Sequence, residues 1–421
     1  MPEIEARYHR RGFGLKREIQ APLRHDYHSR LVEEVCQSGH RLQIGNLTIR
    51  LAEQFGFCYG VDRAVEYAYE TRAKFPDRRL FLIGEIIHNP NVNQRLREMG
   101  IVFLDPPQPL IRISGARDLE TGPRGDSNGG GASADPYARI GPDDVVIIPA
   151  FGVPAHDLDL LHRRGCILVD TTCGSVLNVW KNVGRYARDG FTSIIHGRYW
   201  HEETRATASR AVECHKGHYL VLRDLGEARQ AGQVITGEAD AAAFEERFRA
   251  ASSPGFDARV HLQRLGLANQ TTMLSSESLE IGEELRRALL KRWGQEEAAR
   301  RFRAFDTICS ATQERQDAVL KLVEEELDLM LVVGGYNSSN TAHLAEITSR
   351  KFASYHIQDA ADILDSEAIR HKPAGASSPV TTRGWLPRGR LTVGLTSGAS
   401  TPNSKVGEVM ERLAACCGVH L

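Results

Sequence analysis

The chain has 421 residues, of which 41% are hydrophobic and 25% are charged, as is typical of a soluble globular protein. A formal net charge of −1 argues against a broad surface for nucleic acid or anionic membrane, so we expect an anionic ligand to be bound in a local pocket. Eight cysteines are too sparse for a disulfide scaffold, and we expect them to be buried thiols, metal ligands or reactive groups.

No apolar run reaches the roughly eighteen residues that a membrane span requires, and the first residues lack the hydrophobic core of a signal peptide. Glu3 and Glu5 also fit poorly with an organelle transit peptide, which is usually poor in acidic residues. We therefore predict a cytoplasmic protein that binds neither a membrane nor a nucleic acid.

The first third of the chain contains an extension and then an alternation of strands and helices. Residues 1–48 are polar, with one short helical pattern at 29–35, and we interpret them as an N-terminal extension. From 51 to 104 the spacing of the apolar residues alternates between the pattern of a strand and that of a helix. This βαβ alternation predicts a parallel sheet. We place a first α/β domain at 49–170, interrupted at 106–143 by a stretch rich in glycine and serine that we expect to be a flexible surface insertion.

The alternation resumes after this stretch and recurs through the rest of the chain. We predict a second α/β domain at 171–306, closed by a helical run from 276 to 300, and a third at 307–421. Three small α/β domains of similar plan are the simplest explanation of this recurring pattern. Open α/β sheets bind ligands at the carboxyl ends of their strands. Domains arranged around a common centre would bring these loops to a single cavity.

A cysteine ends a predicted strand at the same place in each of the three units. These residues are Cys58, Cys173 and Cys309, and a second strand with a polar loop follows each of them about thirty residues later. Thiolates bind iron-sulfur clusters and zinc, and the N-terminus of a following helix lowers the pKa of a thiol. Structural zinc would need a fourth protein ligand, whereas a cluster held by three thiolates leaves one iron open to a substrate.

Burial of a small side chain is the alternative explanation for any one of these cysteines. Burial does not require the same position three times, so the repeated register favours one shared metal site. Cys166 precedes an apolar strand and is better explained by core packing. The other cysteines show no register with the repeat: Cys36, Cys214, Cys416 and Cys417.

Ordered motifs lie in these loops and span residues 51–402, which is nearly the whole chain outside its ends. They are Phe55-Gly56-Phe57-Cys58-Tyr59-Gly60-Val61, Glu85-Ile86-Ile87-His88-Asn89-Pro90, Pro149-Ala150-Phe151-Gly152, Asp170-Thr171-Thr172-Cys173, His196-Gly197 with His201-Glu202-Glu203-Thr204, Ala268-Asn269-Gln270-Thr271-Thr272, Cys309 with Gln313-Glu314-Arg315-Gln316, Asn337-Ser338-Ser339-Asn340 and Thr396-Ser397-Gly398-Ala399-Ser400-Thr401-Pro402. With these motifs the chain resembles the 4-hydroxy-3-methylbut-2-enyl diphosphate reductase family. The segment 8–14 resembles the extension of the longer plant and cyanobacterial branch of that family.

The resemblance implies a three-lobed pseudo-symmetric fold around an oxygen-sensitive 4Fe-4S cluster on Cys58, Cys173 and Cys309. It also implies a reaction in which two electrons and two protons remove the hydroxyl of an allylic diphosphate as water, giving isopentenyl and dimethylallyl diphosphates. This is the last step of the methylerythritol phosphate route to isoprenoids. Electrons in this family come from a ferredoxin or a flavodoxin.

The family resemblance assigns Glu203 as the proton source. A carboxylic acid in a closed pocket beside an anionic diphosphate should have a raised pKa, as the release of a proton near neutrality requires. From local sequence alone, an exposed glutamate in the first turn of a helix explains the residue equally well. Glu202 is then the residue that we expect to face solvent.

The diphosphate needs several donors, for which the motifs offer hydroxyls, an amide and two histidines that can supply a switchable positive charge. The assigned residues are His88, His201, Thr271, Ser338, Ser339, Asn340 and Ser400, with Thr272 and Thr312 as nearby candidates. Each has a structural alternative: an ordinary helix N-cap, a hydrogen-bonded histidine or a turn-stabilising hydroxyl.

Two positions depart from the family pattern. Many bacterial members carry a further phosphate-binding histidine where this chain has Phe151, so one contact must be lost or replaced, with Arg198 as one candidate. The loop after Cys173 reads Gly174-Ser175 instead of proline and a bulky residue, which puts the packing near the cluster in doubt.

Two other functions remain open at this point. A hydro-lyase similar to quinolinate synthase would also use a three-cysteine cluster but would bind a carboxylate substrate. A non-catalytic iron or redox sensor would need a partner or nucleic-acid surface, which the net charge does not indicate. The product ratio, the physiological electron donor and the oligomeric state do not follow from the sequence.

Overall fold

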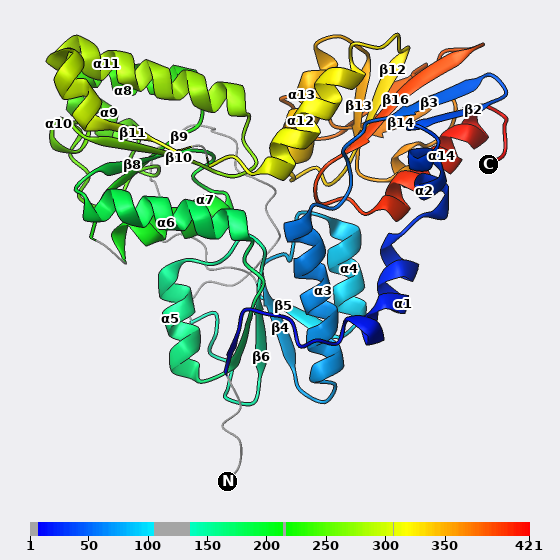
Figure 1. Ribbon diagram of the computed structural model, residues 1–421, viewed down its shortest axis with the longest axis horizontal. Helices are drawn as coiled ribbons and strands as arrows, with labels where there is room; N and C mark the ends of the chain where they lie inside the picture. Colours follow the sequence, from blue (N-terminus) through cyan, green and yellow to red (C-terminus); the bar gives the residue numbers. More distant parts are fainter. Residues whose placement is uncertain (1–6, 105–134, 214–215, 306) are drawn as a thin grey trace.

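The computed structural model describes residues 7–104, 135–213, 216–305 and 307–421, which form three lobes around a common centre (Figure 1). Each lobe is built on a mainly parallel sheet with helices packed on it, so the predicted α/β class with three similar domains in a trefoil is confirmed. No helix in these ranges is both long enough and apolar enough to cross a membrane.

The first lobe, at the bottom of Figure 1, has a parallel sheet in the order β1-β7-β6-β4-β5. Alternate residues of β4 enter two separate hydrophobic clusters, which explains why this strand is a continuous apolar run. The strands are β1 (Tyr8–His9), β4 (Leu80–Ile83), β5 (Ile101–Leu104), β6 (Val145–Ile148) and β7 (Ile167–Asp170), and the helices are α1 (Lys16–Tyr27), α3 (Tyr59–Lys74), α4 (Pro90–Glu98) and α5 (Ala155–Arg164).

The second lobe, at the upper left, has a parallel sheet in the order β11-β10-β8-β9. The helical run predicted at 276–300 is confirmed, although the helix is bent at Gly294, whose φ of 79° is not helical. The strands are β8 (Thr192–His196), β9 (Tyr219–Leu222), β10 (Leu265–Asn269) and β11 (Phe302–Ala304), and the helices are α6 (Gly174–Arg188), α7 (Glu202–Val212), α8 (Leu225–Thr236), α9 (Ala241–Arg247), α10 (Ala258–His261) and α11 (Ser275–Arg301).

The third lobe, at the upper right, has a sheet in the order β13-β12-β16-β3-β2, in which only the β2–β3 pair is antiparallel. Its strands are β2 (Arg41–Ile44), β3 (Leu47–Leu51), β12 (Leu329–Val333), β13 (Ser354–Ile357) and β16 (Leu391–Ser397), with a small hairpin of β14 (Ala368–His371) and β15 (Val380–Arg383). Its helices are α2 (Arg30–Gln37), α12 (Ser310–Leu322), α13 (Ser339–Ser349), α14 (Asn403–Cys416) and the 3₁₀ helix η1 (Ala360–Asp362).

The start of the chain is built into two lobes, which corrects the predicted boundary at residue 49. Strand β3 was expected to belong to the first domain, but it pairs in parallel with β16 of the third lobe, where Ile49 and Val393 are both fully buried. Its partner lies more than three hundred residues away, and apolar periodicity does not reveal a partner at that distance. The predicted extension also contributes β1 to the first sheet, while α1 packs on α3.

The insertion predicted at 106–143 falls largely on residues 105–134, which lie outside the described residues. Its remaining part, from 135 onwards, packs on the first lobe, because Tyr137 and Ile140 are buried in a hydrophobic cluster of that lobe. This end of the segment is therefore part of the fold and not a surface insertion.

Candidate active site

Each of the three predicted cysteines caps the N-terminus of a helix. Cys58 precedes α3, Cys173 precedes α6 and Cys309 precedes α12, and all three have an extended backbone. The first turn of a helix has unbonded amides and the positive end of the helix dipole, so negative charge on these sulfurs is stabilised there. At Cys309 the sulfur accepts a hydrogen bond from the Thr312 amide at 3.3 Å.

The three thiols lie together where the lobes meet. A side-chain carbon built on Gly60 would be 2.5 Å from the sulfur of Cys173 and 4.0 Å from that of Cys58, so both sulfurs border the same space. Burial raises the pKa of Cys58, and the charge of Cys173 raises it further. Burial also raises the pKa of Cys309 to about 11, with the charges of Cys58 and Glu203 acting in the same direction. Such thiols stay protonated at neutral pH unless a metal holds them as thiolates.

The three sulfurs are not close enough together for all of them to bind one metal ion. A tetrahedral zinc ion with sulfur ligands at about 2.3 Å needs sulfur atoms about 3.8 Å apart. Within the described ranges, one ligand atom from each of His88, His201 and Glu202 lies within 4.8 Å of the other two. The three cysteine sulfurs do not meet this condition. The donor set therefore fits a larger, polynuclear group held by soft sulfur ligands.

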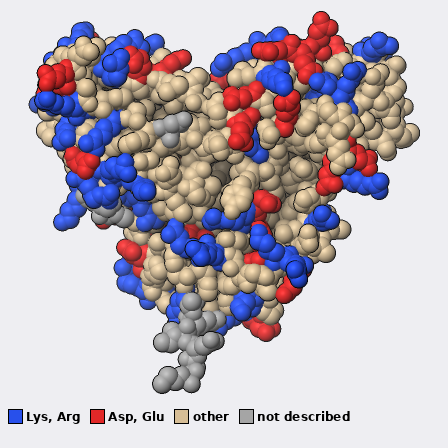
Figure 2. Space-filling model, viewed as in Figure 1, with Lys and Arg blue, Asp and Glu red and all other residues tan. Residues whose placement is uncertain are grey.

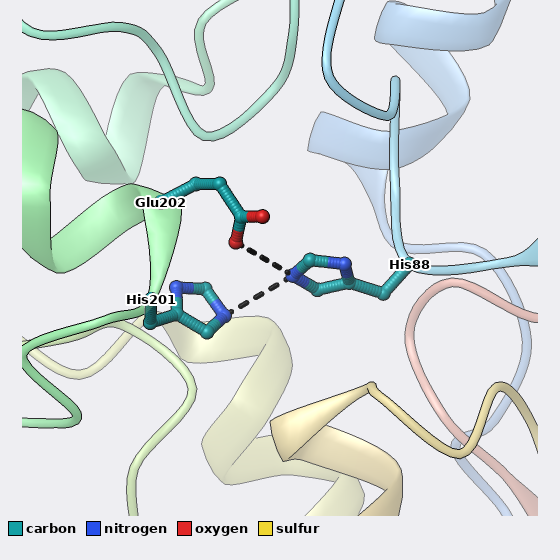
Figure 3. Close-up of side chains that lie close together, drawn as sticks. All are labelled: His88, His201 and Glu202. Atoms are coloured by element: carbon teal, nitrogen blue, oxygen red, sulfur yellow. Dashed lines mark hydrogen bonds and ion pairs between the residues drawn. The ribbon is translucent and has the colours of Figure 1, made fainter. Parts of the chain in front are cut away.

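The imidazole rings of His88, in the first lobe, and His201, in the second lobe, are in contact (Figure 3). Their Nε2 atoms are 3.1 Å apart, and an oxygen of Glu202 is 3.7 Å from Nε2 of His88. His201 is the N-cap of α7, where its Nδ1 accepts a hydrogen bond from the Glu203 amide at 3.2 Å. A neutral His201 must therefore carry its proton on Nε2, on the side that faces His88.

The hydrogen bonds of His88 agree with this position of the proton on His201. When Nε2 of His88 accepts the proton of His201, its own proton lies on Nδ1 and is donated to Glu85 at 3.0 Å. Burial lowers the pKa of His201 well below its ordinary value, and the charges of His88 and Arg198 lower it further. Burial therefore favours the neutral, donating form of His201, and the positive charge that we expected beside a phosphate stays a prediction.

Glu203 is almost completely buried, with 1% of its surface exposed. Its two oxygens accept hydrogen bonds from the amide of Thr271 at 2.6 Å and from the hydroxyl of Thr271 at 3.0 Å. Burial raises the pKa of Glu203 to about 7, although the two Thr271 bonds and the charge of His88 lower it. The alternative of an exposed first-turn glutamate is therefore excluded, and this carboxyl is able to hold and release a proton near neutrality.

The polar residues at the start of α13 form a third side of the site. Ser338 is the N-cap and accepts a hydrogen bond from the Thr341 amide at 3.3 Å, and Ser339 and Asn340 form the first turn. Oδ1 of Asn340 accepts a hydrogen bond from the Ala399 amide at 2.9 Å, but its Nδ2 is buried without a partner among the described residues. An unpartnered buried donor is costly, so this site is suited to an acceptor that a ligand supplies.

Ser400 joins the third lobe to the first, because its hydroxyl donates to the carbonyl of His88 at 3.2 Å. Two amide side chains that we had not assigned also belong to the site. Asn337 donates to Glu85 at 3.0 Å, and Gln270 donates to Ser339 at 3.3 Å. Both lie inside the motifs that carry the family resemblance, which is the sequence signal that would have found them.

Phe151 stacks on the ring of His88 with centroids 4.3 Å apart, so an aromatic contact replaces the expected polar one. Arg198 lies close enough to lower the pKa of His201, and its amide donates to Gln270 at 3.2 Å. At the other departure, a side-chain carbon on Gly174 would have no atom within 4 Å, so the glycine leaves open space beside Cys173.

A buried cation lies beside the cysteines and was not predicted. Arg315 is 3% exposed, and its guanidinium donates to the carbonyls of Gly56 at 2.7 Å and Ala311 at 2.8 Å. Burial lowers the pKa of this arginine, and the charges of Cys58 and Cys309 raise it. Negative sulfur atoms at the site would therefore compensate the buried positive charge.

Comparison with known proteins shows the family to which the chain belongs. The model of the LytB protein family matches residues 49–414. Three curated relatives, each called 4-hydroxy-3-methylbut-2-enyl diphosphate reductase, are 46 to 48% identical to the chain. They come from Gloeobacter violaceus (47% identity, 98% of this chain and 93% of the relative), Thermosynechococcus vestitus (46%, 97% and 94%) and Parasynechococcus marenigrum (48%, 97% and 95%).

Two solved structures are similar to the fold. One is a structure of (E)-4-hydroxy-3-methyl-but-2-enyl diphosphate reductase, described as the terminal enzyme of the non-mevalonate pathway, with 25% identity and a TM-score of 0.50 over 87% of this chain and 99% of that one. The other is a reductase from Plasmodium falciparum with 19% identity and a TM-score of 0.59 over 88% of this chain and 90% of that one. At that identity, the second similarity concerns the fold alone.

Proposed function

The chain belongs to the LytB protein family of 4-hydroxy-3-methylbut-2-enyl diphosphate reductases, and from this premise we propose that it reductively dehydroxylates that allylic diphosphate. The resemblance on which the sequence prediction depended is thus confirmed, and so is the assignment as an enzyme of this type. In the proposed reaction two electrons and two protons enter, the carbon–oxygen bond of the alcohol breaks, and water leaves. The products are isopentenyl and dimethylallyl diphosphates, as in the last step of the methylerythritol phosphate route.

One observation carries the proposal: three helix-capping thiols from different parts of the chain lie close enough for their charges to interact, and they lie near a buried carboxyl whose pKa is raised to about 7. Cys58, Cys173 and Cys309 would hold a 4Fe-4S cluster, and three soft sulfur donors that are not all within 4.8 Å of one another are compatible with that group. When bound, such a cluster supplies electrons and an iron that no protein side chain occupies.

The remaining residues bind the substrate and supply a proton. Glu203 acts as the general acid that protonates the departing hydroxyl, and Thr271 fixes the direction of its carboxyl through two hydrogen bonds. The diphosphate takes the donors at the start of α13 together with Nε2–H of His201, which would turn from His88 to a phosphate oxygen. Ser400 keeps the backbone of His88 in place, and the lobes exclude water from the site.

Product analysis tests this function. Protein reconstituted with iron and sulfide without oxygen should convert the allylic diphosphate to isopentenyl and dimethylallyl diphosphates when a reduced viologen supplies electrons. A protein with an intact cluster that forms neither product would contradict the proposal and favour a hydro-lyase with a carboxylate substrate. Ferredoxin or flavodoxin is the proposed natural donor, acting in the cytoplasm.

Replacing Asn340 with aspartate tests the diphosphate site. Asn340→Asp keeps the oxygen that accepts from Ala399 but replaces the unpartnered Nδ2 donor with an anionic oxygen. The lost bond and the added repulsion predict a KM for the diphosphate that is at least about thirtyfold higher, with a smaller change in kcat. The matched control is Asn178→Asp on the exposed face of α6. An unchanged KM in Asn340→Asp would contradict a phosphate contact at this residue.

Gly60→Ala tests the space beside the sulfurs. The new carbon would lie 2.5 Å from the sulfur of Cys173, so that sulfur would have to move and could not keep its ligand position. We expect an iron content well below that of the wild type after anaerobic reconstitution, with an unchanged circular dichroism spectrum. The control is Gly174→Ala, which adds the same carbon where no atom lies within 4 Å. Equal iron content in the two variants would show that the space beside Gly60 is not part of the metal site.

A further inference from the structure

Cys58 is one of the residues that line a surface hollow of about 610 Å³. Helices α1 and α3 border it, and in Figure 1 these two helices lie side by side in the first lobe. The apolar part of the lining comes from the following residues: Leu23, Tyr27, Phe55 and Phe57. A predicted metal ligand therefore lines an opening whose lining does not include His88, His201 or Glu203.

The rim of this hollow is cationic on the side of α1. Lys16, Arg17 and Arg24 are exposed there, and Lys16 forms an ion pair with Glu66 of α3 at 2.9 Å. Arg17 and Arg24 have no side-chain partner within the part of the chain that the structure describes. Asp62 is the other acid of the lining. Two arginines thus remain available to an acidic partner.

Tyr59 adds an aromatic contact, since 81% of its surface is exposed directly beside Cys58. Apolar residues, a charged rim and an exposed tyrosine are typical of a protein–protein interface, and arginine and tyrosine are enriched among the residues that contribute most of the binding energy. Elsewhere, on the face shown in Figure 2, acidic and basic side chains are interspersed. The overall charge of −1 means that attraction of an acidic protein must come from a local group of cations such as this rim.

We propose that this hollow, which is bordered by α1 and lined by Cys58, is the docking surface for the acidic one-electron carrier protein that reduces the enzyme. The inference depends on the proposed function, because reductive dehydroxylation consumes two electrons. Two reduced carriers are oxidised for each alcohol that is reduced, and two protons complete the water and the product. Docking over Cys58 places the carrier beside a ligand of the metal group, while the substrate side stays closed.

Charge reversal on the rim tests this proposal with two readouts. The variant Arg17→Glu/Arg24→Glu is compared with Arg229→Glu/Arg259→Glu, which makes the same change at exposed arginines of the second lobe. The probe is an acidic plant-type ferredoxin, whose binding is measured by titration calorimetry and whose electron delivery is measured as turnover. We expect the rim variant to raise the Kd for ferredoxin and lower kcat/KM for it at least about tenfold, and wild-type binding to weaken with added salt.

Turnover with a reduced viologen, a small donor that needs no docking surface, should be unchanged in the rim variant. Ferredoxin binding that is unaltered, or weakened equally in the second-lobe control, would overturn the proposal. A loss of viologen turnover in the rim variant would also overturn it, because α1 would then support the site itself. Wild-type protein that is inactive with viologen would instead refute the proposed function, whatever the binding measurement shows.

Discussion

Glu203→Gln is expected to lower kcat at least about 100-fold, which is the usual contribution of a general acid. The glutamine keeps the shape of the side chain and an oxygen for the Thr271 amide but has no acidic proton to give. Turnover with reduced viologen measures the loss, and visible absorbance checks that the metal group is retained. The neighbouring variant Glu202→Gln is the control, because that side chain is 40% exposed and is expected to have a much smaller effect. Wild-type turnover in Glu203→Gln would contradict the proton-donor role.

The pH dependence follows from the same carboxyl. Its pKa is raised from 4.5 to about 7, so the acid form is lost and wild-type turnover should fall as pH rises above about 7. The negative diphosphate and thiolates move this limit upwards.

Because the folded protein binds this proton more tightly than the unfolded chain, stability is lost as pH rises between about 4.5 and 7, by about 3 kcal/mol in total. Glu203→Gln should therefore be more stable than wild type at pH 8 but not at pH 4.5, as thermal unfolding would show.

Cys309→Ser is expected to abolish turnover and to lower iron binding. Three thiolates leave no spare ligand, and a serine oxygen is a harder and weaker donor for iron in a sulfur-ligated group. Iron and sulfide analysis after anaerobic reconstitution measures the effect, and Cys58→Ser and Cys173→Ser should behave in the same way. Cys36→Ser is the control, because Cys36 packs against the core of the third lobe, away from the metal site. Full iron content in Cys309→Ser would remove this residue from the ligand set.

The sequence predicted the features that repeat and missed several that depend on contacts between distant parts of the chain. The three cysteines could be paired with one another because each precedes a helix at the same place in its unit. The burial of Glu203 was expected from the family resemblance but not from the local sequence, because the hydrogen-bond partner of its carboxyl, Thr271, lies 68 positions away in the chain. The direct contact between His88 and His201 also joins two lobes and leaves no local pattern.

Two further misses have physical causes of the same kind. Strand β3 was placed in the wrong lobe because its apolar alternation shows that it is a strand but does not show which sheet it enters. Arg315 was overlooked because arginine on a helix is usually exposed, and only the approach of the loop at Gly56 buries it.

Mössbauer spectroscopy of protein loaded with ⁵⁷Fe, recorded without oxygen before and after addition of the allylic diphosphate, tests the central claim most directly. With three sulfur ligands for four irons, one iron should be distinguishable from the other three, and its signal should change when the substrate binds. Four irons that remain indistinguishable and unaffected by substrate, or iron bound as single ions, would contradict the account.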